Sequence, residues 1–196
     1  MPRLLAALAV GAIGCSGCSD PTFAEPWAPD CTVELSPEAS LREATDKAAW
    51  RWSVALAPVG VSVVLSDDGA PVLWASDATV QALASEAPLD EWSDPDAPAL
   101  GVTSTKLWAD RVQLDQILFS REQAGELQGN LVSAVLHEIG HGLGLKHVDP
   151  KSGSVMAHGT RGDLDAYPTA GDVQRVQALP YWQWCGEALD AGPAWP

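Results

Sequence analysis

Runs of apolar residues predict five short strands in the first two thirds of the chain. Residues 32–35 alternate polar and apolar side chains, which is typical of a half-buried strand, whereas residues 61–65 are almost wholly apolar, as in a buried strand. Turn-forming residues at 66–69 separate this second strand from the next apolar run. We expect the remaining strands at residues 71–75, 99–105 and 111–118.

Apolar residues spaced three and four positions apart predict three helices. The first is expected from Ser36, as N-cap, with Pro37 at the first helical position, to about Leu56. The second, at residues 128–143, has the most regular apolar face of the chain. The third is expected at residues 169–179, where a threonine and, three positions later, an aspartate match an acidic capping box.

The order of these elements indicates the fold class. Strands are followed by a long helix, loops and a closing helix, which favours a compact α+β architecture. The 196 residues are enough for one domain with a substantial core. Because neither an internal repeat nor a second domain is apparent, we assign residues 31–196 to one domain.

The first residues match an export signal rather than a part of the fold. Arg3 supplies a positive charge and residues 4–14 are apolar or small, a run too short to span a bilayer. The sequence Ala12-Ile13-Gly14-Cys15 resembles the lipobox of bacterial lipoproteins. We therefore expect a signal at 1–14, a lipid anchor on Cys15 and a tether at 15–30. The alternative is cleavage at residues 16–20, which would release a freely secreted protein.

Export would place the cysteines in an oxidising compartment, where disulfides form. With Cys15 lipidated and Cys18 in the tether, Cys31 and Cys185 remain, one near each end of the predicted domain. We expect these two to pair.

The charge of the chain excludes some partners. With 26 acidic and 11 basic residues the net charge is −15, so nucleic acids and anionic membrane headgroups would be repelled. Membrane contact is then expected only through a lipid on Cys15, and the protein is expected to be monomeric. The acidic stretch at 86–98 lacks the ordered spacing of a calcium-binding loop, so calcium is compatible with the sequence but not indicated by it.

One segment combines the residue types of a catalytic zinc site. His137 and His141 are four positions apart in the predicted helix and therefore share one face, where both can bind one ion. Gly144 allows a sharp turn that returns His147 as third ligand. Three protein ligands leave a position open for water, and Glu138 can reach that water as a general base. A structural zinc site would instead be closed by a fourth ligand and would leave Glu138 without a role.

Residues 137–147 resemble the extended zinc signature of the metzincin peptidases, HExxHxxGxxH, at every defining position. Ser154-Val155-Met156 resembles the Met-turn of that family, and residues 169–179 resemble the start of its C-terminal helix, particularly in matrixin-like members. The resemblance implies one catalytic Zn²⁺ and a twisted, mostly parallel sheet. It also implies an antiparallel edge strand, expected within residues 99–105, that binds an extended polypeptide substrate.

Two positions depart from the family pattern. Val148 follows the third histidine, where the residue type helps to separate metzincin subfamilies, so no subfamily is assigned. His158 stands two residues after Met156, where some subfamilies carry a tyrosine that stabilises the transition state. We include His158 with Glu138 as a candidate catalytic residue, and the alternatives are a further zinc ligand or a surface histidine.

The sequence thus predicts a zinc-dependent endopeptidase that hydrolyses peptide bonds by a metal-activated water. A second hypothesis is an exported, zinc-containing surface binding module without significant turnover. The intact Glu138 argues against it, because a binding site does not need that carboxylate. A third is a hydrolase of non-peptide amides that uses the same site.

Overall fold

The computed structural model describes residues 31–86, 99–107, 112–127, 130–157, 166–183 and 185. The predicted export signal and tether, most of the acidic stretch at 86–98, and His158 lie outside these residues. Within them, no helix is both long and apolar enough to cross a membrane.

A five-stranded mixed sheet forms the centre of the molecule, in the order β2-β1-β3-β5-β4. The first four of these strands run parallel to one another, and β4 pairs antiparallel with β5 at the edge of the sheet. The α+β class and the antiparallel edge strand expected within residues 99–105 are therefore confirmed. The strands are β1 (Thr32–Pro37), β2 (Ser62–Leu65), β3 (Ala70–Ala75), β4 (Gly101–Leu107) and β5 (Val112–Ser120).

The predicted start of the first helix was wrong. Ser36 and Pro37 belong to β1, where they pair with Pro71 and Val72 of β3, and α1 (Arg42–Leu56) begins five residues after Pro37. Proline has no backbone N–H to donate, but its fixed φ is compatible with the last position of a strand, where Pro37 stands. Parallel pairing with β3 therefore outweighed the local helix-start signal.

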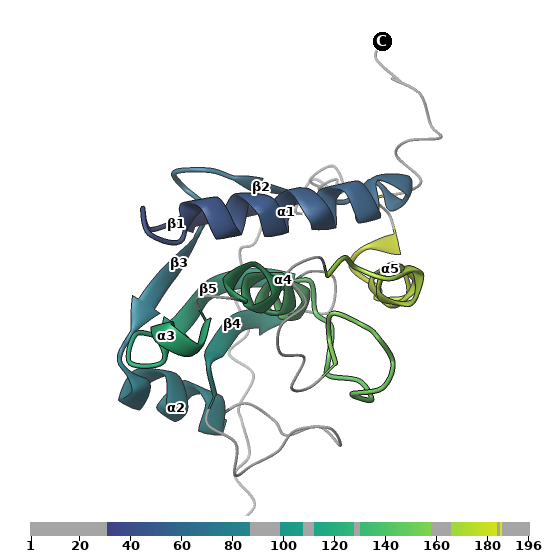
Figure 1. Cartoon of the computed structure of the whole chain (residues 1–196). Coiled ribbons are helices and arrows are strands. Elements are labelled where there is room, and N and C mark those ends of the chain that lie inside the picture. Colours follow the sequence, from purple (N-terminus) through teal and green to yellow (C-terminus); the bar gives the residue numbers. More distant parts are fainter. Residues whose placement is uncertain are drawn as a thin grey trace, which may run out of the picture.

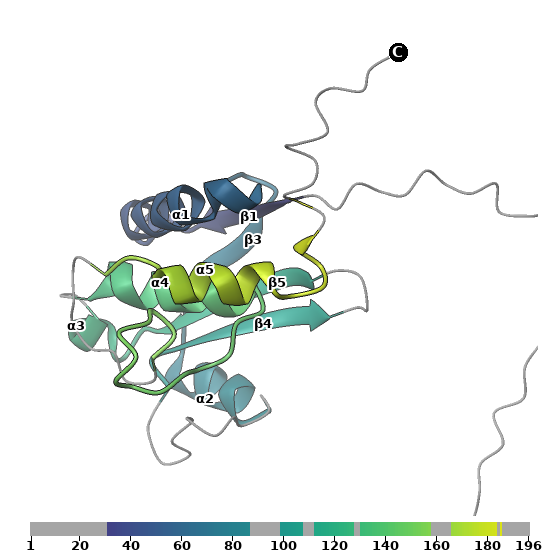
Figure 2. The same cartoon turned by 90° about the vertical axis from the view of Figure 1, so that its right-hand side faces the viewer.

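Helices cover both faces of the sheet (Figures 1 and 2). On one face, α1 packs on β2 and against α4 (Leu131–Gly142), which itself lies over β4 and β5. On the other face, α2 (Asp77–Glu86) contacts the same two strands. The short elements η1 (Ala57–Val59) and α3 (Ala124–Leu127) complete the connections, and α5 (Ala170–Gln177) lies beside α4.

The core between α1, α4 and the sheet fixes the position of α4. Trp52 of α1 is fully buried, and its Nε1 donates to the carbonyl of Leu136 at 2.8 Å. Leu35, Phe119 and Ile139 are also fully buried in this core. Burying side chains of this size typically contributes roughly 1.5–3 kcal/mol each, so α4 has a well-determined place above β4 and β5.

The two ends of the described domain are tied together as predicted. Cys31, directly before β1, forms a disulfide with Cys185, with a Cα–Cα distance of 5.7 Å and a sequence separation of 154. In the chain-entropy description, closing a loop of that length stabilises the fold by roughly 4–5 kcal/mol.

Candidate metal centre

The three histidines of the signature meet at the C-terminal half of α4. His137 and His141 are one turn apart on the helix, while Ile139 between them points into the core. The helix ends at Gly142, and Gly144 follows with φ +93°. That left-handed conformation favours glycine, and it turns the chain back so that His147 reaches the other two imidazoles.

The imidazole nitrogens form a nearly equilateral triangle. Each pair of Nε2 atoms among His137, His141 and His147 is separated by 3.2 Å. A tetrahedral zinc ion, with nitrogen ligands at about 2.0–2.1 Å, places those ligands about 3.3–3.4 Å apart. The spacing therefore fits a zinc ion held by three protein ligands.

Hydrogen bonds from the opposite side of two rings orient them toward the centre of this triangle. His137 Nδ1 lies 2.8 Å from the carbonyl of Val155, and His141 Nδ1 lies 2.8 Å from that of Leu145. Because a carbonyl can only accept, each Nδ1 carries the hydrogen, and the neutral ring of each of these two histidines then presents a lone pair on Nε2. Lone pairs that converge at this distance are stabilised by a cation, so the donor chemistry agrees with the spacing.

The predicted Met-turn, residues 154–156, packs under the same part of α4. Met156 is fully buried, and a side chain at Gly140 would collide with its sulfur atom. Val148, directly after the third histidine, donates its backbone N–H to the carbonyl of Met156 at 3.1 Å. The turn thus supports the histidines both through Val155 and through the strand-like contact at Val148.

A buried aspartate attaches α5 to the Met-turn. Asp172 completes the predicted capping box with Thr169, and its carboxylate also accepts from Ser154 Oγ at 2.5 Å and forms an ion pair with Arg175. Burial by itself raises the pKa of Asp172, but the hydrogen bonds from Ser154 and Thr169, with the charge of Arg175, hold it below its ordinary value. The sequence indicated the cap but not its link to the Met-turn.

Glu138 is buried beside the histidines, with 7% of its surface exposed. Its carboxylate Oε2 accepts a hydrogen bond from Thr103 Oγ1 of β4 at 2.6 Å. Burial raises the pKa of Glu138, against the smaller lowering effects of His137 and of the Thr103 hydrogen bond. Neither Thr103 nor its neighbour Gly101 was identified from the sequence, because the contact joins residues 35 positions apart.

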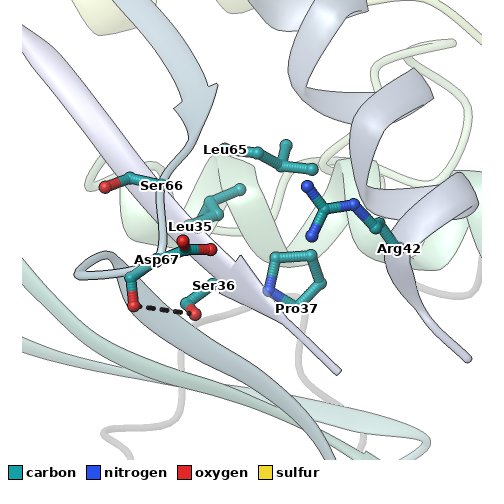
Figure 3. Close-up of a pocket in the computed structure, with 7 residues that line it drawn as sticks. All are labelled: Leu35, Ser36, Pro37, Arg42, Leu65, Ser66 and Asp67. Carbon is teal, nitrogen blue, oxygen red and sulfur yellow. Dashed lines mark hydrogen bonds between the residues drawn. The ribbon is translucent and has the colours of Figure 1, made fainter. Parts of the chain in front are cut away.

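A separate cavity of about 190 Å³ lies at the ends of β1 and β2 (Figure 3). Its charged side chains are Arg42 and Asp67, of opposite sign, and no histidine lines it. This cavity is therefore distinct from the metal centre. The predicted catalytic residue His158 lies outside the described residues, so its role stays a prediction.

The comparison with protein families agrees with the fold and with the histidine cluster. A family model described as matrixin, of the M10 peptidases, matches residues 37–181, well over half of the chain. The chain belongs to the matrixin family of zinc metallopeptidases, within the metzincin group that its zinc signature resembles. No curated protein matches the chain.

Proposed function

We propose that this matrixin is an exported endopeptidase that uses Glu138 as the general base for the hydrolysis of peptide bonds. The observation that carries the proposal is the place of Glu138, one residue after His137, with its carboxylate buried next to the three histidines. Burying a carboxylate costs free energy, and carboxylates with strongly perturbed surroundings cluster at functional sites.

The chain's own residues divide the chemistry between them. His137, His141 and His147 would hold one zinc ion, which when bound supplies an activated water and polarises the scissile carbonyl. Glu138 would take a proton from the attacking water and deliver it to the nitrogen of the leaving amine. Among the residues that the structure describes, no strand pairs with the outer edge of β4, and this edge would bind an extended polypeptide by β-augmentation.

The substitution Glu138→Gln tests the general base. A carboxamide has nearly the same shape but cannot accept the proton, so we expect kcat for a peptide substrate to fall by about 10²–10⁴-fold. Zinc content and thermal unfolding should stay close to those of the wild type. The same change at the exposed Glu126 of α3 is the matched control and should leave kcat unchanged.

The substrate for this assay is chosen by incubating the wild-type protein with a degenerate peptide library, with and without a zinc chelator. Unchanged kcat in Glu138→Gln would remove Glu138 from its assigned role. A wild type that binds zinc stoichiometrically but cleaves no peptide would favour the surface binding module or an amide hydrolase instead.

Export is supported by the disulfide between Cys31 and Cys185, since such bonds persist in oxidising compartments. We propose further that the lipobox-like Cys15 carries a lipid that anchors the domain to the cell envelope. Metabolic labelling with a tagged fatty acid in a bacterial host should mark the wild type and not Cys15→Ser. An unlabelled wild type, found in the medium, would mean that the protein is freely secreted.

A further inference from the structure

Both oxygens of the Glu138 carboxylate lie against the same edge strand. Oε2 accepts from Thr103 Oγ1 at 2.6 Å, and Oε1 lies 2.9 Å from the position that a Cβ on Gly101 would occupy. Gly101 and Thr103 are two positions apart on β4, so they face the same side of the sheet, toward α4. The strand thus forms a cradle for the carboxylate, with a donor on one side and a vacant side-chain position on the other.

The hydroxyl of Thr103 has one hydrogen and two acceptors within reach. It lies 2.6 Å from the carboxylate of Glu138 and 2.9 Å from that residue's own carbonyl. The shorter distance is that of a charge-assisted O–H···O⁻ bond, which is about twice as strong as a neutral one. Oε2 is thus engaged in this hydrogen bond, and Oε1 is the oxygen that would accept the proton of the attacking water.

The space at Gly101 has a second wall. A Cβ there would also stand 2.9 Å from two ring atoms of Phe119, which is fully buried on β5. Neither the ring nor the backbone of β4 can move away easily, because β4 and β5 pair along their length, with Gly101 opposite Phe119 and Thr103 opposite Ile117. Any side chain at this position would therefore displace the carboxylate.

We propose that Thr103 is a positioning residue, which together with the space at Gly101 holds the Glu138 carboxylate in its working orientation. This inference rests on the proposed role of Glu138 as general base. Strand β4 would then have two functions: its outer edge would bind the substrate backbone, and Thr103 would orient the carboxylate of Glu138. The same rigid strand would then position both the substrate and the Glu138 carboxylate, as a near-attack geometry requires.

The test compares Thr103→Val, which removes the donor and keeps the shape, with Thr103→Ser, which keeps the donor. Loss of a hydrogen bond to a charged group corresponds to about a tenfold to hundredfold fall in kcat. We expect that fall in Thr103→Val, with KM changed less than about twofold, and recovery of most of the activity in Thr103→Ser. Zinc content should be the same in all three proteins.

Thr45→Val is the matched control. Thr45 is fully buried in α1 and donates to the carbonyl of Leu41 at 2.9 Å, so the change removes a buried threonine hydrogen bond away from the site. It should lower thermal stability but leave kcat near the wild-type value. Gly101→Ala is a second, independent variant, in which the displaced carboxylate should also lower kcat while zinc is retained.

The outcomes separate this inference from the proposed function. If the wild type cleaves peptide and Glu138→Gln does not, an unchanged kcat in both Thr103→Val and Gly101→Ala overturns the positioning role alone. Equal losses in Thr103→Val and Thr103→Ser would also overturn it, because a hydroxyl in the right place would then not matter. A wild type without hydrolysis would overturn the proposed function itself.

Discussion

Gly144 is the residue at which the chain leaves α4 and begins to return His147 to the metal centre. Its φ of +93° favours glycine, and a Cβ there would collide with the hydroxyl of Tyr181. Tyr181 belongs to the segment after α5, in which Trp182 Nε1 also donates to the carbonyl of Leu143 at 2.9 Å. The turn is thus constrained both by its own backbone and by the C-terminal segment packed on it.

Gly144→Ala should therefore weaken zinc binding as well as stability. The left-handed conformation alone costs an alanine roughly 1–2 kcal/mol, and the collision with Tyr181 adds to that cost. Gly153→Ala is the matched control, because Gly153 also has positive φ, +69°, but has open space around it. In Gly153→Ala we expect the free energy of unfolding to fall only by the cost of placing alanine at positive φ. In Gly144→Ala it should fall further, because of the collision with Tyr181.

Zinc release to a chelator should separate these two variants further. It should be faster than in the wild type only for Gly144→Ala, because only that turn carries His147. Equal losses of unfolding free energy in the two variants would show that the contact with Tyr181 is unimportant, and equal rates of zinc release would show that the turn at Gly144 does not position His147.

At the scale of elements, the carboxylate of Asp172 links α5 to the Met-turn beneath the metal centre. Asp172 caps its own helix by accepting from the backbone N–H of Thr169 at 2.8 Å, and it holds the Met-turn through Ser154. Ser154 Oγ in turn accepts from the backbone N–H of Met156 at 2.9 Å. The position of α5 is thereby linked to that of Met156, which packs against Gly140 under the histidines.

This arrangement predicts a specific dependence of stability on pH. Because the folded-state pKa of Asp172 is held below its ordinary value of about 3.8, its ionised form stabilises the fold above that pH. The contribution is lost as the pH falls through the folded-state pKa. We expect Asp172→Asn to lower the free energy of unfolding by roughly 1–3 kcal/mol at pH 7, with a smaller difference from the wild type at pH 3.

Urea titrations of both proteins at pH 7, 5 and 3 measure this difference. Asp46→Asn, an exposed position on α1, controls for the loss of one surface charge. A difference between wild type and Asp172→Asn that stays constant down to pH 3 would contradict a stabilising role of the ionised carboxylate.

At the scale of the whole molecule, the order of the strands brings distant segments to one place. The metal centre combines α4, the loop that carries His147, the Met-turn and the edge strand β4, and the disulfide joins the residue before β1 to the segment after α5. That segment packs against the end of α4 through Tyr181 and Trp182. Tying the ends of the domain therefore also stabilises the part of it that presents His147.

Some elements of the fold could not be predicted from local patterns. Helix α2 was not predicted, because its sequence shows no regular apolar period; only Val80 of its residues is buried. Its start is nonetheless capped, since Ser76 Oγ accepts a hydrogen bond from the Thr79 N–H. The Ser36-Pro37 pair carried a strong helix-start signal and nonetheless forms the end of β1. At Ser36-Pro37 the parallel pairing with β3 outweighed the local preference.

The sequence by itself determined the class of the protein, because the chemistry of zinc ties residue type to spacing. Two histidines four positions apart on a helix, a glycine and a third histidine leave little choice of geometry, so the cluster of His137, His141 and His147 followed from local rules. Only the tertiary structure decided what surrounds Glu138. Thr103 and Gly101 reach its carboxylate because β4 pairs with β5 beneath α4, and no local pattern encodes a contact between elements that meet only after the chain has folded.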